Sequence, residues 1–404
     1  MRSIQHQRYR LHFEPLSPVH VGSGQTIEPC EYLLRRQGEE GFLIVLDLPR
    51  LFSELSEPER AEYDRVIDRG DLPGLHDWLR RRADPIRHRR FAIQVQLPVY
   101  DHIEQSADDP QRLGEINLFT RDTRTGRPYV PGSSIKGAIR TALVDDAAAN
   151  AGHADERSLQ EIAQFAGRPR EQHKIGHAQR FEAVALGHTR LDRPDRPTPN
   201  LHRDLLRQLA IADITMPGDA CYIDRVQIVQ RPDRQHRGDP RYRQDEAENI
   251  LIYRDMTWSL ADGEAVAFTG EVRLSPHLAD PKLMGRDRRN EPNHLPMALD
   301  IERLCRRCND FYIPRLRDEL ERFRVPDDVA DVVRDAAGRL EAGQCLIRLG
   351  RHSHFECVTL SEPYRQPPAR GFGASRSYAN DGQLPLGWAR LRFEPWPGGT
   401  QDGP

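Results

Sequence analysis

Residues 126–143, GRPYVPGSSIKGAIRTAL, predict a strand that turns into a helix with a polar end. The residue before a proline is driven out of the α region, so the chain is extended up to Pro131, and Pro131-Gly132 makes the bend. Ser133 or Ser134 is the expected N-cap, because a hydroxyl there can accept a hydrogen bond from a backbone N–H. The apolar residues that follow repeat at helical spacing and predict one buried face: Ile135, Ala138, Ile139, Ala142 and Leu143.

Two residues of this helix are locally unfavourable unless an anion binds there. Lys136 lies near the positive end of the helix dipole, which disfavours a cation by about 0.3 kcal/mol, and Gly137 costs about 1 kcal/mol relative to alanine. A phosphate over the amides of Ser133 and Ser134 would compensate the lysine, and the glycine would let a backbone approach closely. Our hypothesis is that Lys136 and Arg140, four residues apart on one face, bind successive phosphates. The alternative is an ordinary amphipathic helix with a solvated basic side.

Composition limits the charge and the location of any binding surface. The chain has 404 residues, enough for one elaborated domain or two to three simple ones, and its formal net charge is −3. A nucleic-acid surface must therefore be a local patch that acidic faces compensate elsewhere. No signal-peptide core and no apolar run of bilayer-spanning length is visible, so we expect a cytoplasmic protein with no membrane partner.

The N-terminal region predicts a strand that ends in a glycine-rich turn. Apolar and charged residues alternate over residues 8–14, which is the period of a half-buried strand. Residues 16–24 (LSPVHVGSG) continue it into a turn whose glycines permit tight backbone geometry. This turn carries four candidate binding residues: His20, Gly22, Ser23 and Gly24.

The whole chain predicts an α+β fold with large insertions. Without its insertions, the order is strand, helix, strand, strand, helix, strand, which is the split βαβ arrangement of a ferredoxin-like, RRM-like domain. We assign residues 1–295 to an N-terminal region with helical and loop insertions. Residues 296–404 form a helical and strand region that completes this unit or adds a second one. An open sheet of this kind can carry single-stranded RNA without any catalytic group.

A dense basic run precedes the central motif. Residues 79–90 hold six arginines and one aspartate, Asp84. The run is either a solvated face or a surface that touches phosphates. The arginines are Arg80, Arg81, Arg82, Arg87, Arg89 and Arg90.

The six cysteines predict no metal site and no cofactor. Cys305 and Cys308 have the spacing of a zinc half-site, but they lie in a helical pattern and no second half-site follows at a suitable distance. Cys345 and Cys357, in predicted strands, are expected to be buried thiols.

With these motifs in place, the chain resembles the RAMP superfamily of CRISPR effector proteins. The resemblance rests on residues 16–24 (LSPVHVGSG), 129–143 (YVPGSSIKGAIRTAL), 347–354 and 384–388 (LPLGW). Within the superfamily, the ensemble of motifs and the length are most similar to the family of fifth Csm subunits, which lie at the head of type III-A complexes. One departure is the glycine-rich loop, since residues 350–354 (GRHSH) hold a single glycine.

The resemblance implies a modified ferredoxin-like RAMP fold and a structural, non-enzymatic role in antiviral defence. Members of that family cap the 3′ end of the crRNA and support crRNA maturation, and they are not the subunits that cleave the target. The implied partners are crRNA, the adjacent backbone RAMP subunit and the small helical subunit, with target RNA met only indirectly. The predicted RNA-binding residues are His20, Gly22, Ser23, Gly24, Gly132, Ser133, Ser134, Lys136, Gly137, Arg140 and Arg351.

Two alternatives remain open from the sequence. Some RAMP proteins cut RNA without a metal by means of a histidine general base, and this chain has candidate histidines. The other alternative is the head RAMP subunit of a Cmr-type complex, which is also a binding role. The histidines are His20, His177, His188, His352 and His354.

Overall fold

The structure is a computed structural model of the chain. It describes residues 5–106, 115–164, 177–189, 199–230, 252–264, 266–286, 292–323, 325–364, 373 and 375–402.

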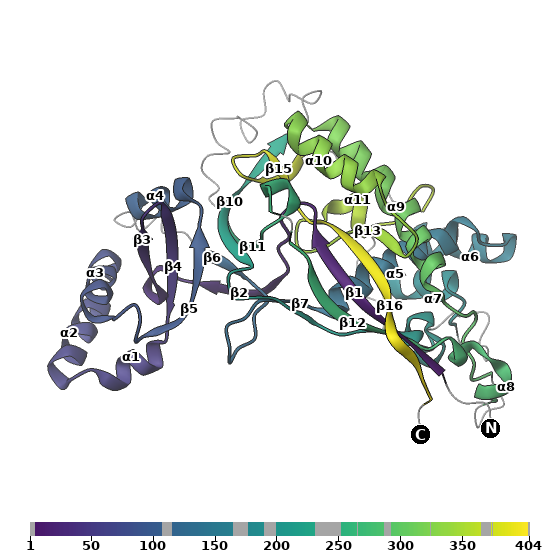
Figure 1. Ribbon diagram of the computed structural model, residues 1–404, viewed down its shortest axis with the longest axis horizontal. Coiled ribbons are helices and arrows are strands. Elements are labelled where there is room, and N and C mark those ends of the chain that lie inside the picture. Colours follow the sequence, from purple (N-terminus) through teal and green to yellow (C-terminus); the bar gives the residue numbers. More distant parts are fainter. Residues whose placement is uncertain are drawn as a thin grey trace.

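One five-stranded sheet joins the two ends of the chain (Figure 1). Its strand order is β13-β16-β1-β12-β8, and all neighbouring pairs are antiparallel. Leu11 and Phe13 of β1 are fully buried, so the strand predicted from the alternation is confirmed. The strands are β1 (Gln5–Pro15), β8 (Leu209–Ile211), β12 (Phe268–Leu274), β13 (Gln344–Arg348) and β16 (Trp388–Asp402).

Two long helices pack together against this sheet. Helix α5 (Gly132–Ala149) packs on α9 (Ile301–Arg322), and α9 in turn packs on β13. The Tyr312 hydroxyl donates to the Ala138 carbonyl at 3.0 Å and links the two helices. Helix α10 (Asp327–Gly338) follows α9.

In chain order, β1, α5, β8, β12, α9 and β16 follow the predicted alternation of strand, helix, strand, strand, helix, strand. The predicted α+β class is confirmed, whereas the ferredoxin-like description stays a prediction. So does the division at residue 295, although β13 and β16 from the C-terminal region pair within the same sheet as β1.

A second, nine-stranded sheet extends away from the first. Its main path is β2-β6-β11-β10-β5-β4-β3, and β14 and β15 branch from β10. Helices α1 (Leu48–Glu54), α2 (Glu57–Asp68) and α3 (Leu72–Arg82) lie at its far end, on the left of Figure 1. The strands are β2 (Gly22–Ile27), β3 (Tyr32–Gln37), β4 (Glu40–Leu46), β5 (Arg89–Val95), β6 (Ile116–Phe119), β10 (Cys221–Gln230), β11 (Ile252–Thr257), β14 (Ser375–Ala379) and β15 (Leu384–Pro385).

The remaining described elements are short. Strand β7 (Tyr129–Val130), which directly precedes α5, pairs separately with β9 (Ile214–Thr215). None of the described helices is both long and apolar enough to cross a membrane. The other α-helices are α4 (Leu97–Ser106), α6 (His153–Gln164), α7 (His177–Ala185), α8 (Pro281–Met284) and α11 (His354–Val358).

The start of α5 differs from the sequence expectation. The helix begins at Gly132, its N-cap is Pro131, and neither Ser133 nor Ser134 caps it, so that prediction is wrong. The Asp213 carboxylate, 81 residues away, accepts the Gly132 N–H at 2.8 Å. A partner from another part of the chain therefore satisfies the helix end, where a local hydroxyl was expected.

A buried aspartate ties β11 to β6. The carboxylate of Asp255 is fully buried, and its Oδ2 accepts the Phe119 N–H at 3.1 Å and the Arg121 Nε–H at 2.9 Å. The Arg121 side chain is itself only 4% exposed. Both charges are thus buried and depend on each other.

We predict that Asp255→Asn destabilises the protein by about 3–5 kcal/mol, because it leaves the buried Arg121 without its counter-charge. Thermal and urea unfolding of the purified variant measure this loss. Asp335→Asn is the matched control, since Asp335 pairs with Arg339 on the surface, with side chains 63% and 78% exposed. It should leave the melting temperature nearly unchanged. Equal effects of the two changes would contradict the structural role of Asp255.

Candidate functional site

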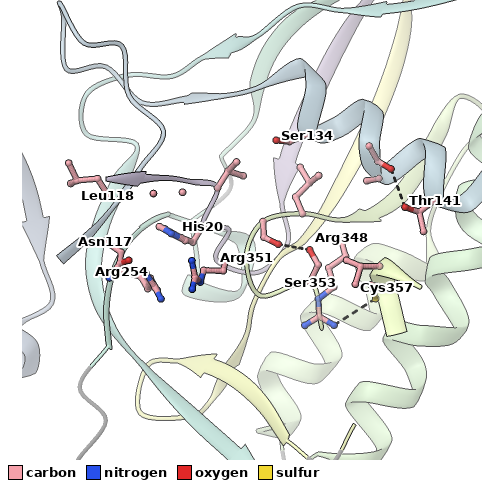
Figure 2. Close-up of a pocket in the computed structure, with 18 of the residues that line it drawn as sticks. His20, Asn117, Leu118, Ser134, Thr141, Arg254, Arg348, Arg351, Ser353 and Cys357 are labelled. Carbon is pink, nitrogen blue, oxygen red and sulfur yellow. Dashed lines mark hydrogen bonds between the residues drawn. The ribbon is translucent and has the colours of Figure 1, made fainter. Parts of the chain in front are cut away.

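A polar cavity of about 420 Å³ lies where the two sheets meet the start of α5 (Figure 2). It is bounded by the segment after β1, by β2, β6 and β11, by α5 and by the loop after β13. Figure 2 shows His20, Arg254 and Arg351 gathered on one side, while Ser134 and Thr141 of α5 line another. The lining residues therefore come from the start, the middle and the end of the chain.

A close backbone contact brings the two ends of the chain to this cavity. Gly350 has φ +86°, and a Cβ built on it would lie 2.1 Å from the His20 carbonyl oxygen. The Arg351 N–H donates to that same oxygen at 3.2 Å. Only a glycine fits at position 350, and the contact places Arg351 beside His20.

The hydrogen bonds of His20 fix its tautomer. The side chain is 2% exposed, and Nδ1 lies 2.7 Å from the carbonyl oxygen of Asp255. A carbonyl only accepts, so Nδ1 carries the hydrogen and Nε2 presents a lone pair. Burial and the charges of Arg254 and Arg351 lower the pKa of His20 to about 4, although the hydrogen bond to Asp255 opposes this shift. The imidazole is therefore neutral at neutral pH.

Arg254 is a buried cation with unused donors. It is 6% exposed, and its Nε and Nη1 have no hydrogen-bond partner among the described residues. Burial, together with the neighbouring charge of Arg351, lowers its pKa to about 10. A buried guanidinium without a counter-charge is costly, so this arrangement favours an anion in the cavity.

The structure brings together many of the residues predicted from sequence. Ser23, between two lining glycines, is exposed. Ser133 on α5 is also exposed, and Lys136 is partly buried. The predicted residues that line the cavity are His20, Gly22, Gly24, Ser134, Gly137 and Arg351.

The two glycines of the central motif have different surroundings. A Cβ on Gly132 would lie 2.1 Å from the Ile211 carbonyl oxygen, which gives this glycine a packing role. A Cβ on Gly137 would meet nothing within 4 Å. Gly137 thus leaves space in the cavity wall, and its predicted contact with RNA stays a prediction.

Arg140 is held away from the cavity. Its guanidinium forms ion pairs with Glu182 and, at 2.7 Å, with Asp204. It lines a different, largely apolar cavity of about 380 Å³. Burial lowers the pKa of nearby Lys136, while Asp204 opposes that shift. Two carboxylates already neutralise Arg140, which disfavours its predicted phosphate contact.

The sequence reasoning missed Arg254 and Asn117, which also line the cavity. The available signal was weak. Arg254 and Asp255 are adjacent charged residues inside a strand. However, all but three of the 59 lysines and arginines in the chain are arginines. One more arginine therefore does not stand out.

Acidic neighbours compensate part of the basic run. Arg82 pairs with Glu59 at 2.7 Å and with Glu62 at 3.0 Å, and Arg87 pairs with Glu54 at 2.9 Å. These pairs support the solvated-face alternative for this part of residues 79–90.

A model of the RAMP superfamily matches residues 12–215 of the chain. The chain belongs to the RAMP superfamily. The match contains four of the segments that bound the cavity: the segment after β1, β2, β6 and α5.

Named relatives of this RAMP protein point to one subunit family. A Mycobacterium tuberculosis (strain CDC 1551 / Oshkosh) protein named CRISPR system Cms protein Csm5 is 24% identical over 285 residues, covering 66% of this chain and 67% of that protein. An Enterococcus italicus protein of the same name is 29% identical over 150 residues, covering 33% and 42%. The predicted likeness to the fifth Csm subunit is confirmed.

Solved structures share the fold. A chain in a cryo-EM structure of a Csm-crRNA-target RNA ternary complex in a type III-A CRISPR-Cas system gives a TM-score of 0.65 at 20% identity, covering 96% of this chain and 100% of that chain. The crystal structure of T. onnurineus Csm5 gives a TM-score of 0.57 at 18% identity, covering 94% of this chain and 99% of that chain.

The candidate catalytic histidines of this RAMP protein lie in different places. The rings of His20 and His352 are 6.2 Å apart, whereas His188 lies near Asp204 and Glu182. Burial and neighbouring charges lower the pKa of His352 to about 3 and hold that of His354 well below its usual range. A general base works best with a pKa near the operating pH, so these buried histidines are poorly matched to that task.

The cysteine pair is part of the core. Cys305 and Cys308 are buried in α9, and Cys345 of β13 is buried beside them. Cys357 is also buried, but it lies in helix α11 where a strand was predicted. Among the residues that the structure describes, no group of three or more His, Cys, Asp or Glu could hold a metal ion.

We predict that Gly350→Ala destabilises this RAMP protein by more than about 2 kcal/mol. The new Cβ combines a left-handed φ with a clash against the His20 carbonyl oxygen, which is backbone and cannot move aside. Gly38→Ala is the control, since Gly38 has φ +65° and open space around it, and should cost only about 1 kcal/mol. Chemical denaturation measures both, and equal losses would refute the close contact.

We also predict that acidification destabilises the protein through His20 and His352. Both have folded pKa values below 6.5, so between about pH 6.5 and 4 the unfolded chain binds protons that the folded chain does not. This stability is present above pH 6.5, and about 1–2 kcal/mol per histidine is lost on lowering the pH to about 5. Unfolding of wild type and His352→Leu at pH about 7 and 5 checks it.

The difference between wild type and variant isolates the histidine. Burial raises the pKa values of Asp224 and Asp262 to about 6, so their contribution to the stability of the protein decreases as the pH rises. This contribution is the same in wild type and in His352→Leu. If the stability difference between wild type and His352→Leu were the same at both pH values, His352 would have the same pKa in the folded and unfolded states, and the prediction would be wrong.

Proposed function

We propose that this RAMP protein is a crRNA-binding structural subunit of a type III-A CRISPR Csm effector complex, acting in the cytoplasm. In this role it caps the 3′ end of the crRNA and supports crRNA maturation. The observation that carries the proposal is the cavity on which three distant segments converge around the buried Arg254 guanidinium. The relatives named Csm5, and the fold shared with a chain of a Csm-crRNA-target RNA complex, support it.

The electrostatics of the cavity fit a phosphodiester. Arg254 offers donors that no described residue uses, and Arg351 adds a second cation at the same wall. A phosphate would supply both the counter-charge and the acceptors that the buried guanidinium lacks. Contacts to phosphate carry no sequence information, which suits a subunit that must hold any spacer.

The partners follow from the same proposal. We expect the chain to bind crRNA directly, to contact the neighbouring backbone RAMP subunit and the small helical subunit, and to meet target RNA through the crRNA. The names of the relatives favour a Csm assembly over a Cmr assembly. Co-purification with Csm partners separates these two assemblies.

The test is RNA binding by Arg254→Met in the full-length chain. We expect affinity for single-stranded RNA to fall by about tenfold or more, because a charge-assisted hydrogen bond contributes about 1.5–3 kcal/mol. The salt dependence of log K should become shallower by about 0.7. Fluorescence anisotropy at two salt concentrations measures both quantities.

Stability gives an independent check on Arg254. Removing an unpaired buried charge should leave the melting temperature of the free chain unchanged or raise it. Arg339→Met, at a side chain 78% exposed just after α10, is the control and should bind RNA like wild type. If Arg254→Met lowered the melting temperature and spared RNA affinity, Arg254 would be a structural residue and the proposal would lose its main support.

A metal-independent endoribonuclease is the second candidate, and the proximity of His20 to His352 at the cavity favours it. Incubation of repeat RNA and target RNA with the purified chain decides between the two. We expect no cleavage. Cleavage that His20→Ala or His354→Ala abolishes would overturn the structural role.

A further inference from the structure

His20 places a hydrogen-bond acceptor in the cavity beside its cationic donors. Because Nδ1 of His20 donates to the Asp255 carbonyl, Nε2 can only accept while the ring is neutral. No hydrogen bond from another described residue reaches Nε2. His20 is 2% exposed and lines the cavity, so this lone pair is a built feature of the wall.

Gly22 keeps the space around this acceptor open. A Cβ built on Gly22 would lie 2.6 Å from Nε2 and 3.3 Å from Cε1 of His20. Any other residue would therefore cover the ring edge. The glycine leaves room for a ligand atom to approach Nε2.

His20 Nε2 needs a hydrogen-bond donor on the ligand, whereas the two arginines need an anionic acceptor. Arg254 and Arg351 offer donors that suit an anion. A phosphodiester oxygen carries no hydrogen to donate to Nε2, so Nε2 needs a separate donor close to that phosphate. A ribonucleotide has this pair of groups, since its 2′-hydroxyl lies beside the phosphodiester. A deoxyribonucleotide lacks the hydroxyl, and donors on the bases vary with the sequence.

We infer that His20 Nε2 accepts a hydrogen bond from the ribose 2′-hydroxyl of the nucleotide whose phosphate Arg254 and Arg351 hold, so that this cavity selects RNA over DNA. The inference rests on the proposed function and adds a specificity-determining residue to it. In this role His20 accepts a hydrogen bond from the 2′-hydroxyl and does not remove its proton.

The test uses single-stranded RNAs of one sequence and about ten nucleotides, within the usual range of single-strand sites. One RNA is all-ribose, and each of the others carries one 2′-fluoro nucleotide, which keeps an RNA-like sugar but cannot donate. Binding to the full-length chain is measured by anisotropy. We expect one position at which 2′-fluoro weakens wild-type binding about fivefold, as for one neutral hydrogen bond.

Variants assign the effect to His20. In His20→Phe, the all-ribose RNA and the sensitive 2′-fluoro RNA should bind equally. His352→Phe, the same change at the neighbouring ring, should keep the fivefold difference. If His20→Phe fails to fold by thermal unfolding, Gly22→Ala replaces it, because its methyl covers Nε2 and should also remove the difference.

The outcomes separate this inference from the proposed function. If RNA binds but 2′-fluoro has no effect at any position, the hydroxyl reading is wrong and the RNA-binding role stands. If the effect persists in His20→Phe, or in Gly22→Ala where that variant is used, another group reads the hydroxyl and the inference is also wrong. If the wild-type chain binds no RNA, the proposed function fails, and this inference fails with it.

Discussion

The cavity depends on one buried residue, Asp255, whose carboxylate and backbone carbonyl hold two of the segments that line it. Its carboxylate accepts from the Phe119 N–H and from Arg121, which fixes β11 against β6 and the loop that follows. Its carbonyl accepts from Nδ1 of His20, which fixes the segment after β1. In a strand, adjacent side chains point to opposite faces, so anchoring Asp255 also directs Arg254 to the other face.

Two buried arginines line this cavity, and they differ in whether the fold supplies partners for their charge. Arg348 is 3% exposed; it binds Glu319 through both terminal nitrogens, donates through Nε to the Leu386 carbonyl at 3.1 Å and lies 4.7 Å from the Trp388 ring centroid. Its charge is fully used within the fold. Arg254 is buried to a similar extent and has unpaired donors among the described residues. An unpaired buried charge is costly unless a ligand supplies a partner, so Arg254 is the better candidate for binding an anion.

The two ends of the chain close the cavity together. Leu16 N–H donates to the Trp388 carbonyl at 2.9 Å, and the Gly387 N–H donates to the Pro18 carbonyl at 2.8 Å. The Trp388 N–H donates to Ser17 Oγ at 3.0 Å. With the contact of Gly350 against His20, these bonds hold the last strand and the loop after β13 on the segment that follows β1. The cavity is therefore a product of long-range backbone pairing.

Local patterns along the chain predicted individual helices and strands and the kind of residue at the site. Alternation gave β1, the proline-glycine bend and helical spacing gave α5, and the glycine-rich segments marked His20 and Arg351, because these patterns act over a few residues. Which of these side chains share a cavity became clear from the folded chain. It supplied Asp213 at the start of α5, engaged Arg140 with Glu182 and Asp204, and buried Arg254 without a partner among the described residues. Charge pairing and desolvation depend on neighbours that are distant in sequence, and no local pattern records them.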